Sequence, residues 1–189
     1  MTVRGKRVND TFDQVIIATH GDQALKLLSE PSTMENKLLK EFEYSRSTAY
    51  LHRDKNFMPK NRRAWASWNY IETKPGELCV SYWMNLLQGL GASKNFFVTL
   101  NPSHEPSDNI QCFDYSHPIL NSKTNIAKKK LWDLQGKQRT WYCGSYFGFG
   151  FHEDGLQSGL AVAEEITGKS RPWGIINDRI SAPRKRRAG

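Results

Sequence analysis

The sequence predicts a mixed α/β fold, in which an antiparallel sheet with helices is joined to a C-terminal strand–turn–helix unit. Three observations support this prediction. A short apolar run with β-branched residues, 15–18, precedes two helical stretches. Between residues 45 and 115, five short segments rich in aromatic and β-branched residues alternate with turn residues, which is typical of antiparallel strands. Finally, a glycine-rich turn at 144–150 separates a strand from the last helix.

The first elements are a strand and two helices. The apolar run 15–18 is expected to be a fully buried strand, as in a parallel sheet. A first helix follows, since apolar residues recur at helical spacing at Ala24, Leu27 and Leu28. Ser32 and Glu35 have the spacing of a capping box and therefore begin a second helix. The apolar stripe of that helix consists of Leu38, Leu39 and Phe42.

The middle of the chain is expected to form the antiparallel sheet. The predicted strands are STAYLH, RAWASWNYIE, ELCVSYWM, NFFVTLNP and IQCFDYSH. The Lys-Pro-Gly-Glu turn at 74–77 indicates a hairpin between the second and third strands. Five aromatic residues in these strands either line a pocket for a lipid or planar molecule or belong to the core: Trp65, Trp68, Tyr70, Tyr82 and Trp83. A helix over about 123–134 follows the sheet.

The last block predicts a strand over 140–143, the glycine turn, and a helix over about 153–167 that ends at Gly168. Small residues recur along this helix at Gly155, Gly159 and Ala163, so another backbone or a flat ligand can approach closely. Leu156, Leu160 and Ala163 are expected to face the core. A helix N-terminus after glycines suits phosphate or the electron-rich edge of a cofactor, although an ordinary βα unit has the same spacing.

Composition limits the classes of function. The chain has 189 residues and a net charge of +8, of which the run 184–187 contributes four positive charges. The remainder is only mildly basic, so no nucleic-acid partner is expected. No apolar run approaches the ~20 residues of a membrane span, and no signal peptide is recognisable, which predicts a cytoplasmic protein. The three separated cysteines are expected to be buried free thiols, and no spacing indicates a metal site.

The sequence has no G-x-G-x-x-G motif that opens a βαβ unit and no P-loop. Gly148 and Gly150 follow the last predicted strand and are not joined by a third glycine at the required place. The chain therefore carries one half of a cofactor-site pattern, without the half that binds a dinucleotide phosphate.

Several blocks resemble flavin-dependent amine oxidases and related desaturases. FDQVIIATHGDQALKLL is similar to the segment by which these proteins leave their FAD domain, and CGSYFGFGFHEDGLQSGLAVAEEI is similar to their C-terminal FAD motif. LHRDKNFMP, AWASWNY, YWMNLLQ and FVTLNP resemble an amine-oxidase-like subgroup of NAD/FAD-binding proteins, one member of which is fused to plant cyclopropane-fatty-acid synthase. The resemblance covers about residues 8–167.

The resemblance implies two domains, a Rossmann-like FAD domain and a substrate domain with an antiparallel sheet. Residues 1–30 would be the strand and helix that leave the FAD domain, and 31–137 the substrate-domain sheet with its helices. Residues 138–170 would return to the FAD domain, and 171–189 form a basic tail. The dinucleotide-binding half would come from a missing N-terminal half or a companion subunit.

The same resemblance assigns FAD as the cofactor and implies its contacts. Gly144 and Ser145 would approach the diphosphate–ribityl region, and the N-terminus of the last helix would face the isoalloxazine edge. The cofactor-binding residues so implied are Gly144, Ser145, His152, Glu153, Asp154, Gly155, Ser158 and Gly159. No catalytic residue is assigned, since Lys55 and Lys60 look like turn residues rather than the lysine of amine oxidases. His52 and His117 are further candidates for lining the sheet's pocket.

Two classes of function follow from these observations. The first is the C-terminal portion of a FAD-dependent oxidoreductase, which transfers hydride from an unknown substrate, a lipid being one candidate. The alternative is a non-catalytic binding or scaffold subunit with the same fold and no flavin. A nucleic-acid-binding function ranks third. In the first class, the strand at 12–19 and the last helix should each expose an apolar side.

Overall fold

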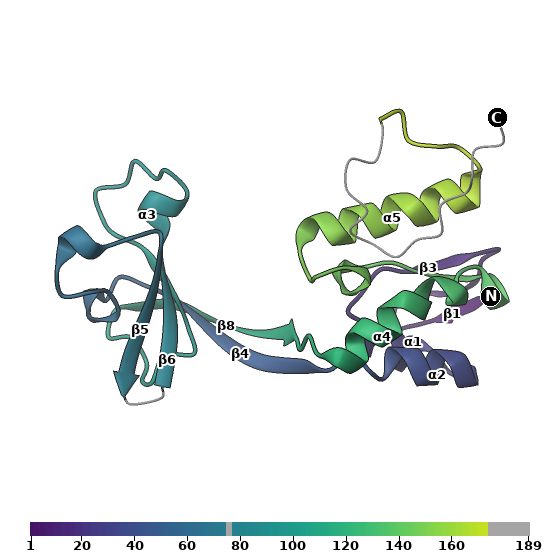
Figure 1. Cartoon of the computed structure of the whole chain (residues 1–189), viewed down its shortest axis with the longest axis horizontal. Coiled ribbons are helices and arrows are strands. Elements are labelled where there is room, and N and C mark those ends of the chain that lie inside the picture. Colours follow the sequence, from purple (N-terminus) through teal and green to yellow (C-terminus); the bar gives the residue numbers. More distant parts are fainter. Residues whose placement is uncertain (75–76, 174–189) are drawn as a thin grey trace. The chain divides into compact units, whose positions relative to one another are not determined.

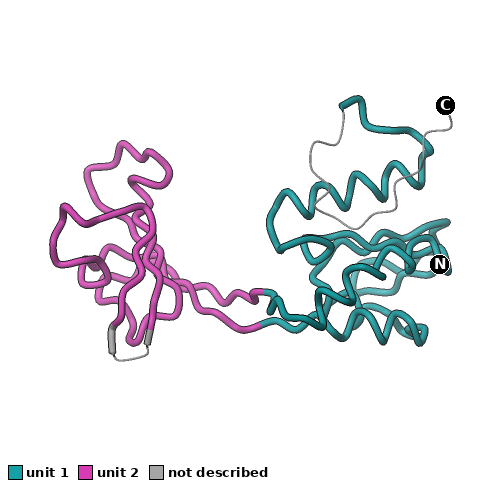
Figure 2. The backbone as a smooth tube through the Cα atoms, in the orientation of Figure 1, with its two compact units in different colours: residues 1–44, 118–189 teal, residues 45–117 magenta. Residues whose placement is uncertain are grey.

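The computed structural model describes residues 1–74 and 77–173 and confirms the mixed α/β fold (Figure 1). The chain divides into two compact units, which Figure 2 distinguishes by colour. Unit 1 contains residues 1–44 and the chain from 118 onward, and unit 2 contains residues 45–117. The basic run 184–187, part of the predicted tail, lies outside the described residues.

Unit 1 contains short strands, helices and turns of 3-10 helix. Its elements are β1 (Thr2–Arg4), β2 (Asn9–Thr11), β3 (Val15–Ile17), α1 (Gly21–Leu27), α2 (Thr33–Leu39), α4 (Ser122–Leu131), η3 (Trp132–Leu134), η4 (Lys137–Arg139), β9 (Thr140–Tyr142), η5 (Ser145–Phe147) and α5 (His152–Thr167). β1 and β2 form an antiparallel pair, and β3 pairs in parallel with β9. The Ser32–Glu35 capping box that begins α2 is confirmed, and Gly168 ends α5 in the left-handed conformation.

The parallel pair of β3 and β9 joins segments far apart in the sequence. Ile16 lies opposite Trp141, and Ile17 lies opposite Tyr142. The prediction of a fully buried strand is wrong for Ile16, whose side chain is 50% exposed, while Ile17 is buried. Alternate strand residues point to opposite faces, and the core of unit 1 covers only the face of Ile17.

A buried polar contact ties this parallel pair to α2. The Tyr142 hydroxyl donates a hydrogen bond to Glu35 at 2.5 Å, and Glu35 also accepts from the backbone N–H of Ser32. Burial raises the pKa of Glu35, but the bonds from Tyr142 and Ser32 outweigh burial and leave the pKa below its ordinary value. The Glu35 carboxylate therefore caps α2 and fastens it to β9.

Unit 2 is built on a five-stranded sheet. Its elements are β4 (Tyr44–His52), η1 (Lys55–Phe57), η2 (Arg62–Ala64), β5 (Trp68–Lys74), β6 (Glu77–Trp83), α3 (Met84–Leu87), β7 (Phe97–Leu100) and β8 (Asn109–Pro118). The strand order is β5-β6-β7-β4-β8, and the predicted hairpin of β5 with β6 is confirmed. The segment predicted as a strand from Arg63 is extended only from Trp68, because the backbone before it turns in η2.

One face of this sheet carries a buried chain of polar side chains. The Nε2 of His52 lies 2.7 Å from the Thr99 hydroxyl, which lies 2.7 Å from the Ser81 hydroxyl. The backbone N–H of Asp54 donates to the Nδ1 of His52 at 3.1 Å. Because Nδ1 accepts this bond, Nε2 carries the proton and donates to Thr99. The network joins β4, β7 and β6 and leaves His52 neutral.

The predicted aromatic cluster is divided between the two faces of the sheet. Trp65 and Trp83 pack edge-to-face at 5.3 Å on the covered side, where Trp65 also contacts Phe97. Trp68 and Tyr70 lie on the opposite side and are largely exposed. Strand alternation therefore directs Trp83 to the covered side, where it is partly buried, and leaves Trp68 and Tyr70 on an open face.

The neutral His52 network makes the stability of the protein depend on pH. Burial lowers the pKa of His52 below its ordinary value, against an opposing effect of Asp54 and Asp108. The unfolded chain then binds the proton more readily than the folded chain, so the free energy of unfolding falls as pH drops below about 6.5.

We expect chemical denaturation to give a smaller free energy of unfolding at about pH 5.5 than at about pH 7. His52→Gln should weaken this dependence and lower stability at neutral pH by about 1–3 kcal/mol, because it removes an acceptor for the Asp54 N–H. His117→Gln, at an exposed position, is the control. A His52→Gln variant with the parent's pH dependence would contradict this explanation.

Candidate functional site

The carboxyl ends of β3 and β9 meet at one edge of the parallel pair. Gly144 follows β9 with a φ of +154°, and a Cβ atom there would lie 2.9 Å from the carbonyl oxygen of Thr19. It would also lie 2.7 Å from the ring of Tyr146. The turn after β9 therefore packs directly against the loop after β3, and only glycine fits at this place.

Ser158 holds the turn against α5. The Gly144 N–H donates to the Ser158 hydroxyl oxygen at 2.9 Å, and that oxygen lies 2.9 Å from the Gly155 carbonyl oxygen. A Cβ at Gly155 would be 3.6 Å from the Ser145 nitrogen, an ordinary contact. The structure thus brings together four of the predicted site residues, and the Ser158 side chain is completely buried among them.

Asp154 points inward from the first turn of α5. Its Oδ2 accepts hydrogen bonds from the backbone N–H groups of Phe149 and Phe151, at 3.0 and 2.9 Å. A Cβ at Gly148 would come within 2.4 Å of the Asp154 carboxyl group. The carboxylate is therefore directed into the turn and away from solvent, and it stabilises the backbone that precedes the helix.

Lys128 of α4 binds the same turn from the other side. Its ammonium group donates to the Gly148 carbonyl at 2.9 Å and lies 4.6 Å from the centre of the Phe149 ring. Burial lowers the pKa of Lys128, and the charge of Asp154 partly offsets this effect. The Asp154 carboxylate thus holds backbone N–H groups of the turn at 148–151, and the Lys128 ammonium group holds a backbone carbonyl of the same turn.

The remaining predicted residues lie at the surface of α5. His152 and Glu153 are exposed in its first turn, where Glu153 accepts a hydrogen bond from Gln157 at 2.6 Å. At Gly159, a Cβ would meet no atom of the described residues within 4 Å. Residues 1–74 and 77–173 therefore leave open the space beside Gly159, which lies one helical turn beyond Gly155.

The face of α5 that packs against the core differs from the prediction. Asp154, Ser158, Ala161 and Val162 are the buried residues of α5. Leu156 is 56% exposed and Ala163 is exposed, so the prediction that they face the core is wrong. Leu156 and Ala163 lie with Gly159 on the side of α5 that points away from these buried residues. The expected apolar exposure on α5 and on the strand at 12–19 is confirmed by Leu156, Phe12 and Ile16.

Sequence reasoning missed His20 and Tyr44 at this edge. His20 precedes α1, directly after Thr19, and its ring stacks on Tyr44 at 4.5 Å. The Tyr44 hydroxyl accepts from the Gly21 N–H at 3.0 Å, and burial raises the Tyr44 pKa. The sequence signal for His20 was its position between a predicted strand and a predicted helix. No sequence signal pointed to Tyr44, which is distant from His20 along the chain.

The other candidate residues are not part of this arrangement. His52 belongs to the buried network of unit 2. Lys55, the first residue of η1, and Lys60 are exposed. Cys79 and Cys143 are buried free thiols as predicted, whereas Cys112 is exposed. Among the described residues, no His, Cys, Asp and Glu side chains gather in a group that could hold a metal ion.

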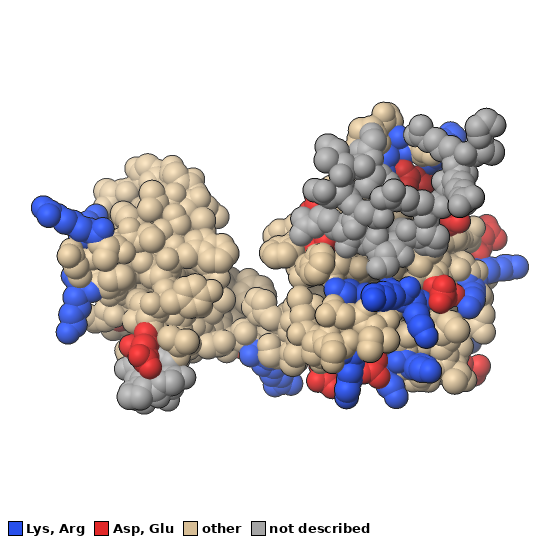
Figure 3. Space-filling view, viewed as in Figure 1, with Lys and Arg blue, Asp and Glu red and all other residues tan. Residues whose placement is uncertain are grey.

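The described part of the chain contains no candidate membrane span. None of its helices has the length and apolar character required to cross a bilayer. On the face shown in Figure 3, Lys and Arg of unit 1 alternate with Asp and Glu, while most of unit 2 is uncharged.

Alanine substitutions at Gly148 and Gly159 should have opposite effects on the stability of the protein. Gly148→Ala should destabilise the protein by about 2 kcal/mol or more, because Asp154 must move and loses charge-assisted hydrogen bonds. Gly159→Ala should stabilise it by up to ~1 kcal/mol, since alanine favours the helix and meets nothing nearby. Thermal and chemical denaturation of both variants measure these differences. Equal effects of the two substitutions would contradict the packing described here.

Comparison with known proteins gives a likeness of fold only. The chain matches no protein-family model. No curated protein sequence is similar to it. Among solved structures, it is similar to a protein from Exiguobacterium sp. 255-15 described as a putative protoporphyrinogen oxidase, with a TM-score of 0.49 and 12% sequence identity. The match covers 85% of this chain and 42% of that chain, so this chain corresponds to less than half of that protein's length.

Proposed function

We propose that this chain is the C-terminal portion of a FAD-dependent oxidoreductase of the amine oxidase and desaturase type. One observation carries the proposal: β3 and β9 are parallel and end at the same edge, and each is followed by the start of a helix. In open parallel sheets, ligands bind in the crevice outside the carboxyl ends of the strands. Two of the sequence blocks that resemble flavoenzymes, 12–28 and 143–166, meet at this same edge.

The residues present are compatible with a flat cofactor. Neither the core of unit 1 nor any other described residue fills the space beside Gly159, and Gly155 makes only one ordinary contact there. Gly144 and Ser145 would lie along the diphosphate–ribityl part of FAD, and Gly155, Ser158 and Gly159 would allow α5 to approach. Bound FAD would accept the hydride from the substrate.

The first turn of α5 would act on the charge that develops at the flavin. Backbone N–H groups at a helix N-terminus favour nearby negative charge. His152 and Glu153 are the exposed side chains of this turn and would lie beside the isoalloxazine edge. Asp154 would not oppose the developing charge directly, because its carboxylate is directed into the turn at 148–151.

The dinucleotide-binding half would be supplied by an N-terminal half or a companion subunit. This chain has no glycine fingerprint for the FAD pyrophosphate. Parallel sheets are normally covered on both faces, whereas Ile16 of the described pair is half exposed, and Leu156 of α5 is exposed as well. Additional strands and helices from such a half would cover these side chains. In this arrangement unit 2 would be the substrate domain, and a lipid is one candidate substrate.

A second candidate function is a non-catalytic binding or scaffold subunit that keeps this fold and binds no flavin. This function is favoured because two of the predicted cofactor-binding residues make hydrogen bonds within the protein itself. Ser158 bonds to Gly144, and Asp154 bonds to the turn before α5. Both roles are complete without a cofactor.

Gly159→Leu separates the two functions. In a complex with the polypeptide encoded by an adjacent reading frame, this change should weaken FAD binding roughly five- to hundredfold. Overpacking a tight site costs about 1–3 kcal/mol, and 1.4 kcal/mol corresponds to a factor of ten. In the chain alone the same change should not lower stability, because no atom of the described residues lies within 4 Å of a Cβ at Gly159. Calorimetric titration with FAD measures the affinity.

Glu164→Leu is the matched control, because it places the same side chain on α5 away from the first turn of the helix. Glu164 hydrogen-bonds to Arg171 and to none of the predicted site residues, so its replacement should leave FAD affinity nearly unchanged. If Gly159→Leu binds FAD as tightly as the parent, the assignment of α5 to the cofactor is wrong. If the folded parent complex takes up no FAD, the scaffold function replaces the enzymatic one.

A further inference from the structure

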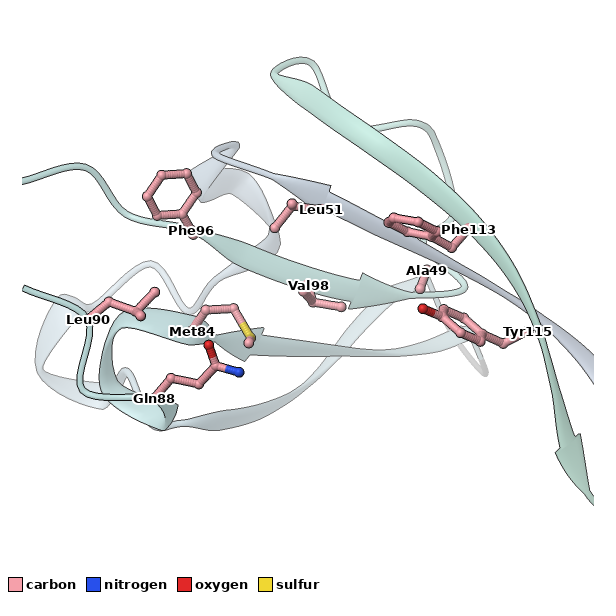
Figure 4. A pocket seen from close by; sticks show the side chains of 9 residues that line it. All are labelled: Ala49, Leu51, Met84, Gln88, Leu90, Phe96, Val98, Phe113 and Tyr115. Atoms are coloured by element: carbon pink, nitrogen blue, oxygen red, sulfur yellow. The ribbon is translucent and has the colours of Figure 1, made fainter. Parts of the chain in front are cut away.

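The open face of the unit 2 sheet contains an apolar groove with a volume of about 450 Å³. Strands β4, β7 and β8 contribute to its floor, and α3 with the following loop forms one end (Figure 4). The lining residues are Ala49, Leu51, Met84, Gln88, Leu90, Phe96, Val98, Phe113 and Tyr115. This volume lies in the range of small-molecule binding sites.

The groove has an elongated, uncharged lining. Figure 4 shows the side chains in a row, from Phe96 and Leu90 at one end to Phe113 and Tyr115 at the other. Its polar side-chain groups are the Gln88 carboxamide and the Tyr115 hydroxyl, and no Asp, Glu, His, Lys or Arg lines it. A lining of this shape and chemistry suits an extended hydrocarbon chain.

A cation lies beyond the Phe96 end of the groove. Ala49 and Leu51 of β4 point into the groove, so strand alternation directs Arg53 to the same side, directly after β4. The guanidinium carbon of Arg53 lies 5.6 Å from the centre of the Phe96 ring. Arg53 therefore stands next to a side chain that lines the groove.

The hydrogen-bonding capacity of Arg53 is largely unused. Its Nε is buried and has no hydrogen-bond partner among residues 1–74 and 77–173. Its closest ion-pair contact, from Nη1 to Asp108, is 3.8 Å, which is too long for a hydrogen bond. Asp108 is more than half exposed, and exposed pairs of this kind contribute little. A planar anion with better geometry would compete successfully for the guanidinium group.

We propose that the groove binds the hydrocarbon chain of a free single-chain carboxylate and that Arg53 binds its carboxylate group. The apolar lining and the cation at one end match the two parts of such a molecule. The site lies entirely within unit 2, for which the proposed function names a lipid as one candidate substrate. Because binding of the carboxylate requires no flavin, it can be tested separately from the flavin site.

Laurate, below its micellar concentration, is the probe, and dodecanol is the uncharged probe of equal chain length. Isothermal titration of the full chain should give tighter binding of laurate than of dodecanol. Arg53→Gln should weaken laurate binding about tenfold, equivalent to ~1.4 kcal/mol, and leave dodecanol binding unchanged. Asp108→Asn should strengthen laurate binding, since it removes the competing carboxylate. Arg63→Gln, at an exposed arginine of η2, should change neither affinity.

Phe113→Glu and Leu90→Glu test the groove from its two ends. Both residues are partly exposed, and circular dichroism with thermal melting will establish that each variant is folded. Either change should weaken binding of both probes by more than tenfold, because it introduces a charge into an apolar lining. Leu78→Glu, at an exposed apolar position outside the lining, is the control.

Three results would overturn this inference. Laurate binding that is unaffected in Arg53→Gln would show that Arg53 does not hold the head group. Binding that persists in both folded groove variants would place the ligand elsewhere. Binding to anionic phospholipid vesicles or dimerisation of the chain, with no uptake of monomeric laurate, would assign the open face to a membrane surface or to a protein interface.

Discussion

The parallel pairing of β3 with β9 is the constraint on which unit 1 depends. It joins a segment near the start of the chain to one that follows all of unit 2. The Cys143 N–H extends the pair by donating to the Ile17 carbonyl at 3.1 Å, and Tyr142 fastens it to α2 through Glu35. Because both strands run in the same direction, their following loops meet, and Gly144 packs against Thr19. The candidate cofactor edge exists only as a result of this long-range contact.

Unit 2 shows how one sheet can present two different surfaces. Its covered face contains the His52–Thr99–Ser81 network and the packed indole rings of Trp65 and Trp83. Such a network is favourable only when each of its buried polar groups finds a partner, so it holds β4, β7 and β6 in a fixed arrangement. Residues that alternate with the network residues along β4, β7 and β6 point to the opposite, open face of the sheet. The rigid covered side therefore supports the apolar groove.

Features of the fold that depend on residues close in sequence could be predicted. Features that depend on packing between distant segments could not. The Ser32–Glu35 capping box, the β5–β6 hairpin and the helix end at Gly168 depend on neighbours in sequence, so short patterns were sufficient. The side of α5 that is buried depends on which element packs there, and periodicity wrongly assigned Leu156 to the core. The meeting of His20 with Tyr44, and the groove beside Arg53, require distant segments to meet. Sequence spacing alone contains no information about these contacts.

The edge formed by β3, β9 and α5 is, in our proposal, half of a flavin site. The visible absorbance spectrum of the chain tests this, purified alone and after co-purification with the polypeptide encoded next to it. We expect no flavin bands for the chain alone and about one bound FAD in the complex, since this chain lacks the glycine fingerprint for the FAD pyrophosphate. A stoichiometric flavin spectrum from the dialysed chain alone would contradict the division of the site. A folded complex without flavin bands would contradict the flavin site itself.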